Sequence, residues 1–208
     1  MKRRIYNLII IDESGSMHAI KQQAIDNINE TIQTIRHAEK KHEDQEHFVT
    51  FVSFNSRVNT LFDCVSADSV NDLKDNDYSP AALTALYDAM GMSLTTLRER
   101  VKEDDKVLVT IVTDGMENAS KEYSGVAIKA LVDELKARGW IFAYMGANHD
   151  VEAAAAHISI TNVMHFEASI HGTDEMSKKH KYAREGLYKR MSESSFSAEK
   201  ENLDFFKE

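Results

Sequence analysis

The sequence predicts an α/β fold: a doubly wound, mostly parallel sheet of about six strands, with helices on both faces and one antiparallel strand at an edge. Two observations predict it. Short apolar runs alternate with amphipathic helical patterns along the chain, and three of the runs are apolar at nearly every position. Alternation at this spacing implies right-handed crossovers, which place helices on both sides of one sheet.

Three runs are rich in β-branched or aromatic residues, as expected for strands buried on both faces of a parallel sheet. They cover residues 5–11 (IYNLIII), 107–113 (VLVTIVT) and 140–145 (WIFAYM). Residues 48–54 and 57–63 are separated by Asn55-Ser56, a pair suited to a tight turn, and predict an antiparallel hairpin at a sheet edge. A weaker strand is expected at 162–166.

The helical segments carry an apolar residue every three or four positions, which indicates one buried stripe. They are expected at 17–38, 82–100, 125–138 and 150–157. Gly139 follows the third segment in the position of a helix C-cap. From about Thr173 onward the chain lacks strand patterning and is highly charged. We therefore expect one domain at 1–172 and a helical, partly disordered extension at 173–208.

Composition and charge limit the classes of function. The chain has 208 residues, 42% of them hydrophobic, and a formal net charge of −9. Net negative charge disfavours the phosphate backbone of nucleic acid as the main partner. Cys64 is the single cysteine, the N-terminus lacks the apolar core of a signal peptide, and no apolar run reaches the length of a membrane span. We expect a cytosolic protein without nucleic-acid or membrane partners; its oligomeric state stays open.

Polar side chains follow two of the apolar runs at the point where each run ends. The first run leads into DESGS at 12–16, and the second ends at Asp114, in TDG at 113–115. Thr84 stands just where a helix is expected to begin. The carboxyl ends of parallel strands meet at one edge of a sheet, which is where such sheets bind ligands. These side chains are therefore expected to lie together.

A tight turn at Gly15 would aim the oxygens of Asp12, Ser14 and Ser16 at one point. With Thr84 and Asp114 the set comprises two carboxylates and three hydroxyls, without sulfur or imidazole. Such donors prefer Mg²⁺, with Mn²⁺ or Ca²⁺ as alternatives. Because few of the donors are charged, coordination positions are left to water or to a partner, and the site would be open. The alternative for the DESGS segment is a cluster of helix N-caps.

These elements resemble the metal-ion-dependent adhesion site of the von Willebrand factor type A family. The signature of that family is D-x-S-x-S, then T, then D, and all five positions are filled here, by Asp12, Ser14, Ser16, Thr84 and Asp114. The segments LTALYDA and TDGMEN look like those of bacterial intracellular members. The resemblance covers about residues 4–170. It implies a Rossmann-like sheet and a divalent cation held by the three hydroxyls and, directly or through water, by the two carboxylates.

The resemblance also implies a divalent-metal-dependent protein-binding module, in which a partner's Glu or Asp carboxylate completes the coordination of the cation. Two alternatives stay open: a Mg²⁺-dependent hydrolase or phosphotransferase, and an accessory subunit whose metal is only structural. The loops at 79–84 and 113–118 contain no lysine, and the chain has no glycine-rich phosphate cradle followed by one. We therefore expect no enzymatic activity.

Other polar residues are interpreted as structural. Asp88 is expected to be a surface acid of its helix, and Cys64 to pack as a small apolar residue. The nine histidines lack the spacing of a zinc site. The basic stretch between 178 and 190, which includes Arg184, is interpreted as a solvated helix face.

Overall fold

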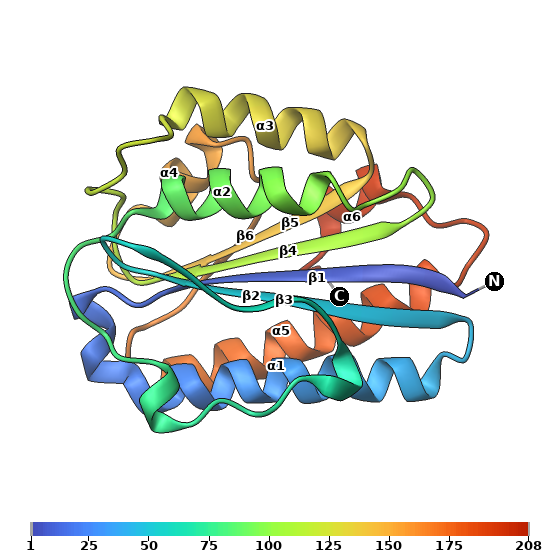
Figure 1. The fold of residues 1–208 in the computed structure, drawn as a ribbon, viewed down its shortest axis with the longest axis horizontal. Helices are drawn as coiled ribbons and strands as arrows, with labels where there is room; N and C mark the ends of the chain where they lie inside the picture. Colours follow the sequence, from blue (N-terminus) through green and yellow to red (C-terminus); the bar gives the residue numbers. More distant parts are fainter. Residues whose placement is uncertain (1, 208) are drawn as a thin grey trace.

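The computed structural model describes residues 2–207 and confirms the predicted fold class (Figure 1). The strands are β1 (Arg3–Asp12), β2 (Gln45–Phe54), β3 (Val58–Ser66), β4 (Lys106–Thr113), β5 (Trp140–Gly146) and β6 (Asn162–His165). They form one sheet with the order β3-β2-β1-β4-β5-β6. All neighbours in it are parallel except β3, which is antiparallel to β2 at the sheet edge. The predicted hairpin is therefore confirmed.

Helices cover both faces of the sheet (Figure 1). The α-helices are α1 (Lys21–Lys41), α2 (Leu86–Arg98), α3 (Gly125–Ala137), α4 (Val151–His157), α5 (Ile170–Met191) and α6 (Ala198–Asp204). Short 3₁₀ helices are η1 (Gly15–Ile20), η2 (Ala67–Ser69) and η3 (Asp75–Asp77). Along β1, Ile9 and Ile11 pack with α1 and α5, whereas Leu8 and Ile10 pack with α2 and α3. This alternation explains why the β1 run is apolar throughout, because both faces of the strand are buried.

Two helices start later than their apolar patterns predict. The segment expected to be helical from residue 17 begins as η1, and α1 starts at Lys21. The segment expected from residue 82 stays a loop until Leu86, and Ala82 in that loop has a φ of +65°. Both delays lie beside the polar residues singled out above. Gly139 has a φ of +84°, as expected for the residue that ends α3.

The C-terminal segment is helical, and its helices lie against the sheet. Leu187, Tyr188 and Met191 of α5 are fully buried in the same core as α1. Arg184 is also fully buried, so its interpretation as part of a solvated basic face is wrong. Its guanidinium donates hydrogen bonds to Thr110 Oγ1 at 2.6 Å and to Asn7 Oδ1 at 3.2 Å, because α5 crosses the middle of β1 and β4. Within residues 2–207, no helix is long and apolar enough to cross a membrane.

Candidate metal site

The candidate site lies where the strand order changes direction. β1 is flanked by β2 on one side and by β4 on the other, so the crossovers leave in opposite directions from the gap between β1 and β4. Asp12 is the last residue of β1, and Asp114 directly follows β4. Figure 1 shows both strands ending at the same edge, opposite the edge where the chain begins. Crevices at this position are the usual ligand sites of such sheets.

Asp12 is held rigidly at the bottom of the site. Its side chain is fully buried; Oδ1 accepts the backbone N–H of Ser14 at 2.7 Å, and Oδ2 accepts the hydroxyl of Thr113 at 2.6 Å. The phenol of Tyr78 donates to the Asp12 carbonyl oxygen. Asp12 therefore fixes the turn that follows it and is itself oriented by β4. No sequence pattern indicated these roles of Thr113 and Tyr78.

The two serines face the site. Ser14 occupies the N-cap position of η1, but its hydroxyl lies 3.1 Å from Ser16 Oγ. Ser16 Oγ in turn donates to Asp114 Oδ1 at 2.5 Å. These hydroxyls contact one another and Asp114, so the alternative interpretation as a set of helix caps does not describe them.

Thr84 reaches the same point from the loop before α2. A Cβ atom placed on Gly115 would lie 3.5 Å from Thr84 Oγ1, 3.8 Å from Ser16 Oγ and 4.0 Å from Asp12 Oδ2. Oxygens from two segments, residues 12–16 and the loop before α2, thus lie around one position beside Gly115 of a third loop. The structure brings all five predicted residues together, through these distances and the Ser14–Ser16–Asp114 contacts.

Backbone hydrogen bonds join the three loops. Gly15 N–H donates to Ala82 O at 3.1 Å, and Ala81 N–H donates to Glu13 O at 2.9 Å. Gly15 makes its turn without a positive φ, since among the glycines of residues 2–207 only Gly139 has one. The turn at Gly15 therefore does not need a left-handed backbone. Its backbone is held by hydrogen bonds to residues 81–82.

Two acids and an amide hold the loop that follows β4, and no sequence pattern indicated the roles of the two acids. Asn118 Oδ1 accepts Thr84 N–H at 2.9 Å, and Asn118 N–H donates to Thr84 O at 3.0 Å. Glu117 accepts the N–H groups of Tyr87, at 2.9 Å, and of Ser120, at 2.8 Å. Asp88 is buried and accepts three consecutive N–H groups, from residues 121–123, at 2.8–2.9 Å. Its interpretation as a surface acid is wrong.

The site concentrates negative charge in a buried place. Burial raises the pKa of Asp12, and hydrogen bonds from Thr113 and Ser14 offset only part of that effect. Burial also raises the pKa of Asp114, against the hydrogen bond from Ser16 and the nearby His149. Among residues 2–207, no Lys, Arg or His side chain forms an ion pair with either carboxylate. Two buried acids with hydroxyl neighbours fit a hard divalent cation, whose charge would offset the cost of burying theirs.

The site opens on one side. Asp12, Ser14, Thr84 and Asp114 are each at most 3% exposed, whereas Ser16 is exposed. A group bound here therefore keeps contact with solvent or with a partner only past η1 and the rim of the loops. Nothing in the described residues gathers three or more His, Cys, Asp or Glu side chains into a metal cluster. The candidate site is of a different kind, because most of its donors are hydroxyls.

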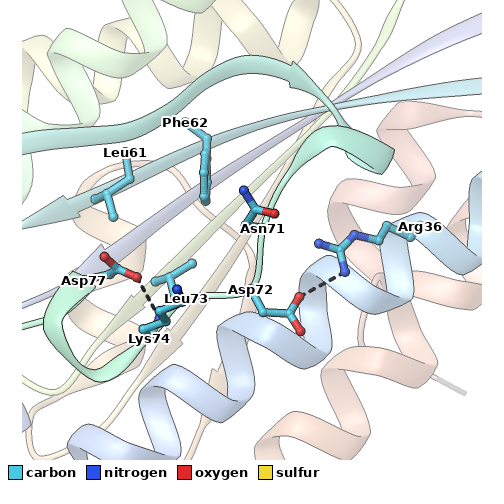
Figure 2. A pocket seen from close by; sticks show the side chains of 8 residues that line it. All are labelled: Arg36, Leu61, Phe62, Asn71, Asp72, Leu73, Lys74 and Asp77. Carbon is cyan, nitrogen blue, oxygen red and sulfur yellow. Dashed lines mark hydrogen bonds and ion pairs between the residues drawn. The ribbon is translucent and has the colours of Figure 1, made fainter.

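A pocket lies elsewhere on the molecule. A cavity of about 840 Å³ is lined by residues of α1, β3 and the loop that carries η3, among them Arg36, Phe62 and Leu73 (Figure 2). Arg36 is already paired with Asp72 at 3.0 Å. The five candidate ligands are not part of this cavity.

Comparison with known proteins agrees with the fold. The family model described as "von Willebrand factor type A domain" matches residues 8–178. A sequence comparison with curated proteins gives no match. Solved structures are similar at low identity, which shows the fold alone.

Three of these structures are representative. A von Willebrand factor type A protein from Catenulispora acidiphila has a TM-score of 0.63 at 13% identity, covering 88% of this chain and 43% of its own. The manganese-loaded Plasmodium vivax TRAP protein has a TM-score of 0.53 at 16% identity, covering 85% and 71%. Mussel proximal thread matrix protein 1, with a zinc-occupied MIDAS motif, has a TM-score of 0.53 at 16% identity, covering 85% and 44%. The chain thus spans less than half the length of the bacterial and mussel proteins.

Proposed function

The chain belongs to the von Willebrand factor type A domain family, and we propose that it is a divalent-metal-dependent protein-binding module. One observation carries the proposal. Oxygens of Asp12, Ser16 and Thr84 lie within 4.0 Å of a single position beside Gly115, and Ser14 and Asp114 are hydrogen-bonded into the same group. The segments LTALYDA and TDGMEN favour a bacterial intracellular member of the family, which would act in the cytosol.

The proposed metal is Mg²⁺, with Mn²⁺ or Ca²⁺ as alternatives. All five donors are hard oxygens, and Mg²⁺ is held in proteins by one or two carboxylates together with neutral oxygens and water. Two of the similar structures are described with manganese and with zinc, which supports a divalent metal of this class. When bound, the metal would supply positive charge and an open coordination position.

The proposed partner is a protein that presents a Glu or Asp side chain. This chain's own residues would orient that carboxylate, because Ser16 on the exposed side and Thr84 beneath the loop rim fix the direction from which it can approach. Asp12 and Asp114 stay buried and would balance the metal's charge. The choice of partner then depends on the direction from which its carboxylate approaches the metal as well as on its charge.

Binding, rather than catalysis, is what this donor set supports. The loops at 79–84 and 113–118 carry no lysine to handle a transferred phosphoryl group. The imidazole whose charge acts on Asp114, that of His149, is hydrogen-bonded to Ala147 O at 2.6 Å and lies 3.3 Å from the Tyr144 hydroxyl. It is therefore already engaged and does not pair with Ser14 or Ser16 as a general base would.

Calorimetry tests the metal assignment. Titration of Mg²⁺, Mn²⁺ and Ca²⁺ into the wild-type protein is expected to show one site, and Asp12→Ala is expected to abolish it. Equal affinity in the Asp12→Ala variant would show that the metal assignment is wrong.

Affinity capture then tests the binding function. Bait protein is compared in Mg²⁺, in EDTA and as Asp12→Ala, with Asp133→Ala as a surface-acid control. Partners are expected only with wild type and control in Mg²⁺. Equal recovery in EDTA would contradict the metal-bridged mechanism. A large thermal stabilisation by Mg²⁺ without any metal-dependent partner would favour a structural metal instead.

A further inference from the structure

Large apolar side chains are exposed at seven positions in residues 2–207, and two of them stand on the loops of the metal site. The seven are Leu83, Met92, Met116, Val126, Ile170, Tyr182 and Leu203. A single exposed apolar residue is ordinary on a protein surface and needs no explanation. Leu83 and Met116 differ from the others because each is next to a residue that forms the site.

The backbone places these two residues next to the site. Leu83 directly precedes Thr84, and Met116 directly follows Gly115, beside which the donor oxygens converge. The two loops are joined by the pair of hydrogen bonds between Thr84 and Asn118, and Leu83 N–H is bonded to Ser56 Oγ at 3.1 Å. Leu83 is 55% exposed and Met116 is 67% exposed, although the loops that carry them are held on both sides. Their exposure therefore does not result from a loose loop.

The half-buried acidic side chains of the site's loops accept hydrogen bonds from backbone N–H groups. Glu13 accepts the N–H of Ser79, and the Glu117 carboxylate accepts N–H groups of Tyr87, Ala119 and Ser120. Both acids are thereby used to fix the loops. Because both carboxylates accept backbone N–H groups, the loops around the site are compatible with an anionic ligand.

We propose that Leu83 and Met116 form an apolar rim that recognises the side chains next to the partner's acidic residue. The partner is then a protein segment in which an Asp or Glu is flanked by apolar side chains. This inference rests on the proposed function, since the acid must first enter the metal site. Burial of exposed Leu and Met side chains supplies binding free energy that the carboxylate alone lacks. Met is well suited to such a rim, because its unbranched side chain adapts to different partners.

Selection from a random heptapeptide library displayed on phage tests the proposal. Wild-type protein is the bait in Mg²⁺, and bound phage are eluted with EDTA. The expected clones share an Asp or Glu with Leu, Ile, Val, Met or Phe within two positions. Clones that share the acid without any apolar preference would overturn the rim and leave the proposed function standing. Absence of acid-containing clones from the EDTA eluate would overturn the proposed function and the rim together.

Matched variants then test the two residues directly with a synthetic version of the selected peptide. Leu83→Ser and Met116→Ser are each expected to raise its Kd about five- to tenfold, while Mg²⁺ affinity by calorimetry stays within about twofold. Leu203→Ser is the control, because Leu203 is 56% exposed on α6, toward the other end of the sheet (Figure 1). It is expected to leave the Kd unchanged. Equal effects of Leu83→Ser and Leu203→Ser, or no effect of either rim variant, would contradict the proposal.

Discussion

At the scale of single residues, Gly115 makes a sharp test of the metal site. The Cβ of an alanine at this position would make ordinary contacts of 3.5–4.0 Å with three donor oxygens, and the backbone there is not left-handed. Gly115→Ala should therefore fold, with a stability equal to wild type or higher by about 0.5 kcal/mol. The methyl group would occupy space beside the oxygens that a hydrated cation needs. We predict that Mg²⁺ affinity falls at least about tenfold, as measured by calorimetry.

Gly15→Ala is the matched control for this prediction. Its added methyl group would lie 3.5 Å from Ala82 O, and no atom of Asp12, Thr84 or Asp114 lies within 4 Å of it. Unfolding in urea should show both variants folded, and Gly15→Ala should keep Mg²⁺ affinity within about twofold. If Gly115→Ala binds Mg²⁺ like wild type, the metal lies elsewhere.

The sequence predicted the five candidate ligands but not that the acids Asp88 and Glu117 position them. Asp12, Ser14 and Ser16 are recognisable because they are close together in the sequence. Thr84 is recognisable because it stands where a helix is expected to begin, and Asp114 because it stands where a strand is expected to end. Asp88, Glu117 and Asn118 bond to backbone groups that become neighbours only after the loops have folded. Their roles depend on loop conformation, which neither periodicity nor residue type encodes.

At the scale of elements, α2 and the loop after β4 behave as one unit because of Asp88. Its carboxylate accepts the N–H groups of residues 121–123, which have no strand or helix to supply acceptors. Asp88→Ala would leave these three N–H groups without their charged partner. We predict a loss of about 2–4 kcal/mol in the free energy of unfolding and faster hydrogen exchange at 121–123.

Asp133→Ala is the control for Asp88→Ala, because Asp133 is an exposed acid paired with Lys129 on α3. Its effect on unfolding should stay within about 0.5 kcal/mol. Equal losses in the two variants would mean that Asp88 does not organise the loop.

Most elements were predictable, and the errors lie where an element meets the site. The strands follow from runs buried on both faces, and the end of α3 follows from Gly139. The predicted starts of α1 and α2 were too early. The apolar residues of η1 and of the 82–85 loop continue the helical spacing in the sequence, but these segments are not α-helical. Arg184 was misjudged because a basic residue among lysines looks solvated, whereas α5 turns it toward polar groups of β1 and β4.

At the scale of the whole molecule, buried histidine couples stability to pH. Burial, and then the charge of Arg184, lowers the pKa of His47 to about 3. An unfolded chain would protonate His47 near its ordinary pKa of about 6.5. Stability from neutral His47 is therefore fully present above about pH 6.5 and is lost as the pH falls toward 3.

Urea unfolding between pH 6.5 and 4 measures this effect. His47→Gln should show a slope of unfolding free energy against pH that is shallower than wild type, by up to about 1.4 kcal/mol per pH unit. His171→Gln is the control, since His171 is exposed at the start of α5. Parallel slopes for wild type and His47→Gln would show that His47 is not held neutral.

Side chains of α5 and α6 form part of the hydrophobic core. The sequence predicts one domain at 1–172 with an extension after it, whereas α5 and α6 place Met176, Leu187, Tyr188, Met191 and Phe205 in the core. Five such side chains contribute roughly 10 kcal/mol, which is comparable to the whole stability of an ordinary domain. A chain ending at residue 172 would also leave Asn7 and Thr110 without Arg184. We predict that 1–172 shows no cooperative unfolding by circular dichroism or calorimetry.

A second truncation separates loss of α5 from loss of chain length. A chain ending at residue 192 keeps α5 and loses α6, including Phe205 and the hydrogen bonds of Asn202 to Trp140 O and Phe142 N–H. It should unfold cooperatively at a lower temperature than the full chain, because the face of the sheet over β1 and β4 remains covered. Mg²⁺ affinity should survive in it, since the site lies at the other end of those strands. Cooperative unfolding of 1–172 at the temperature of the full chain would instead make the last two helices a true extension.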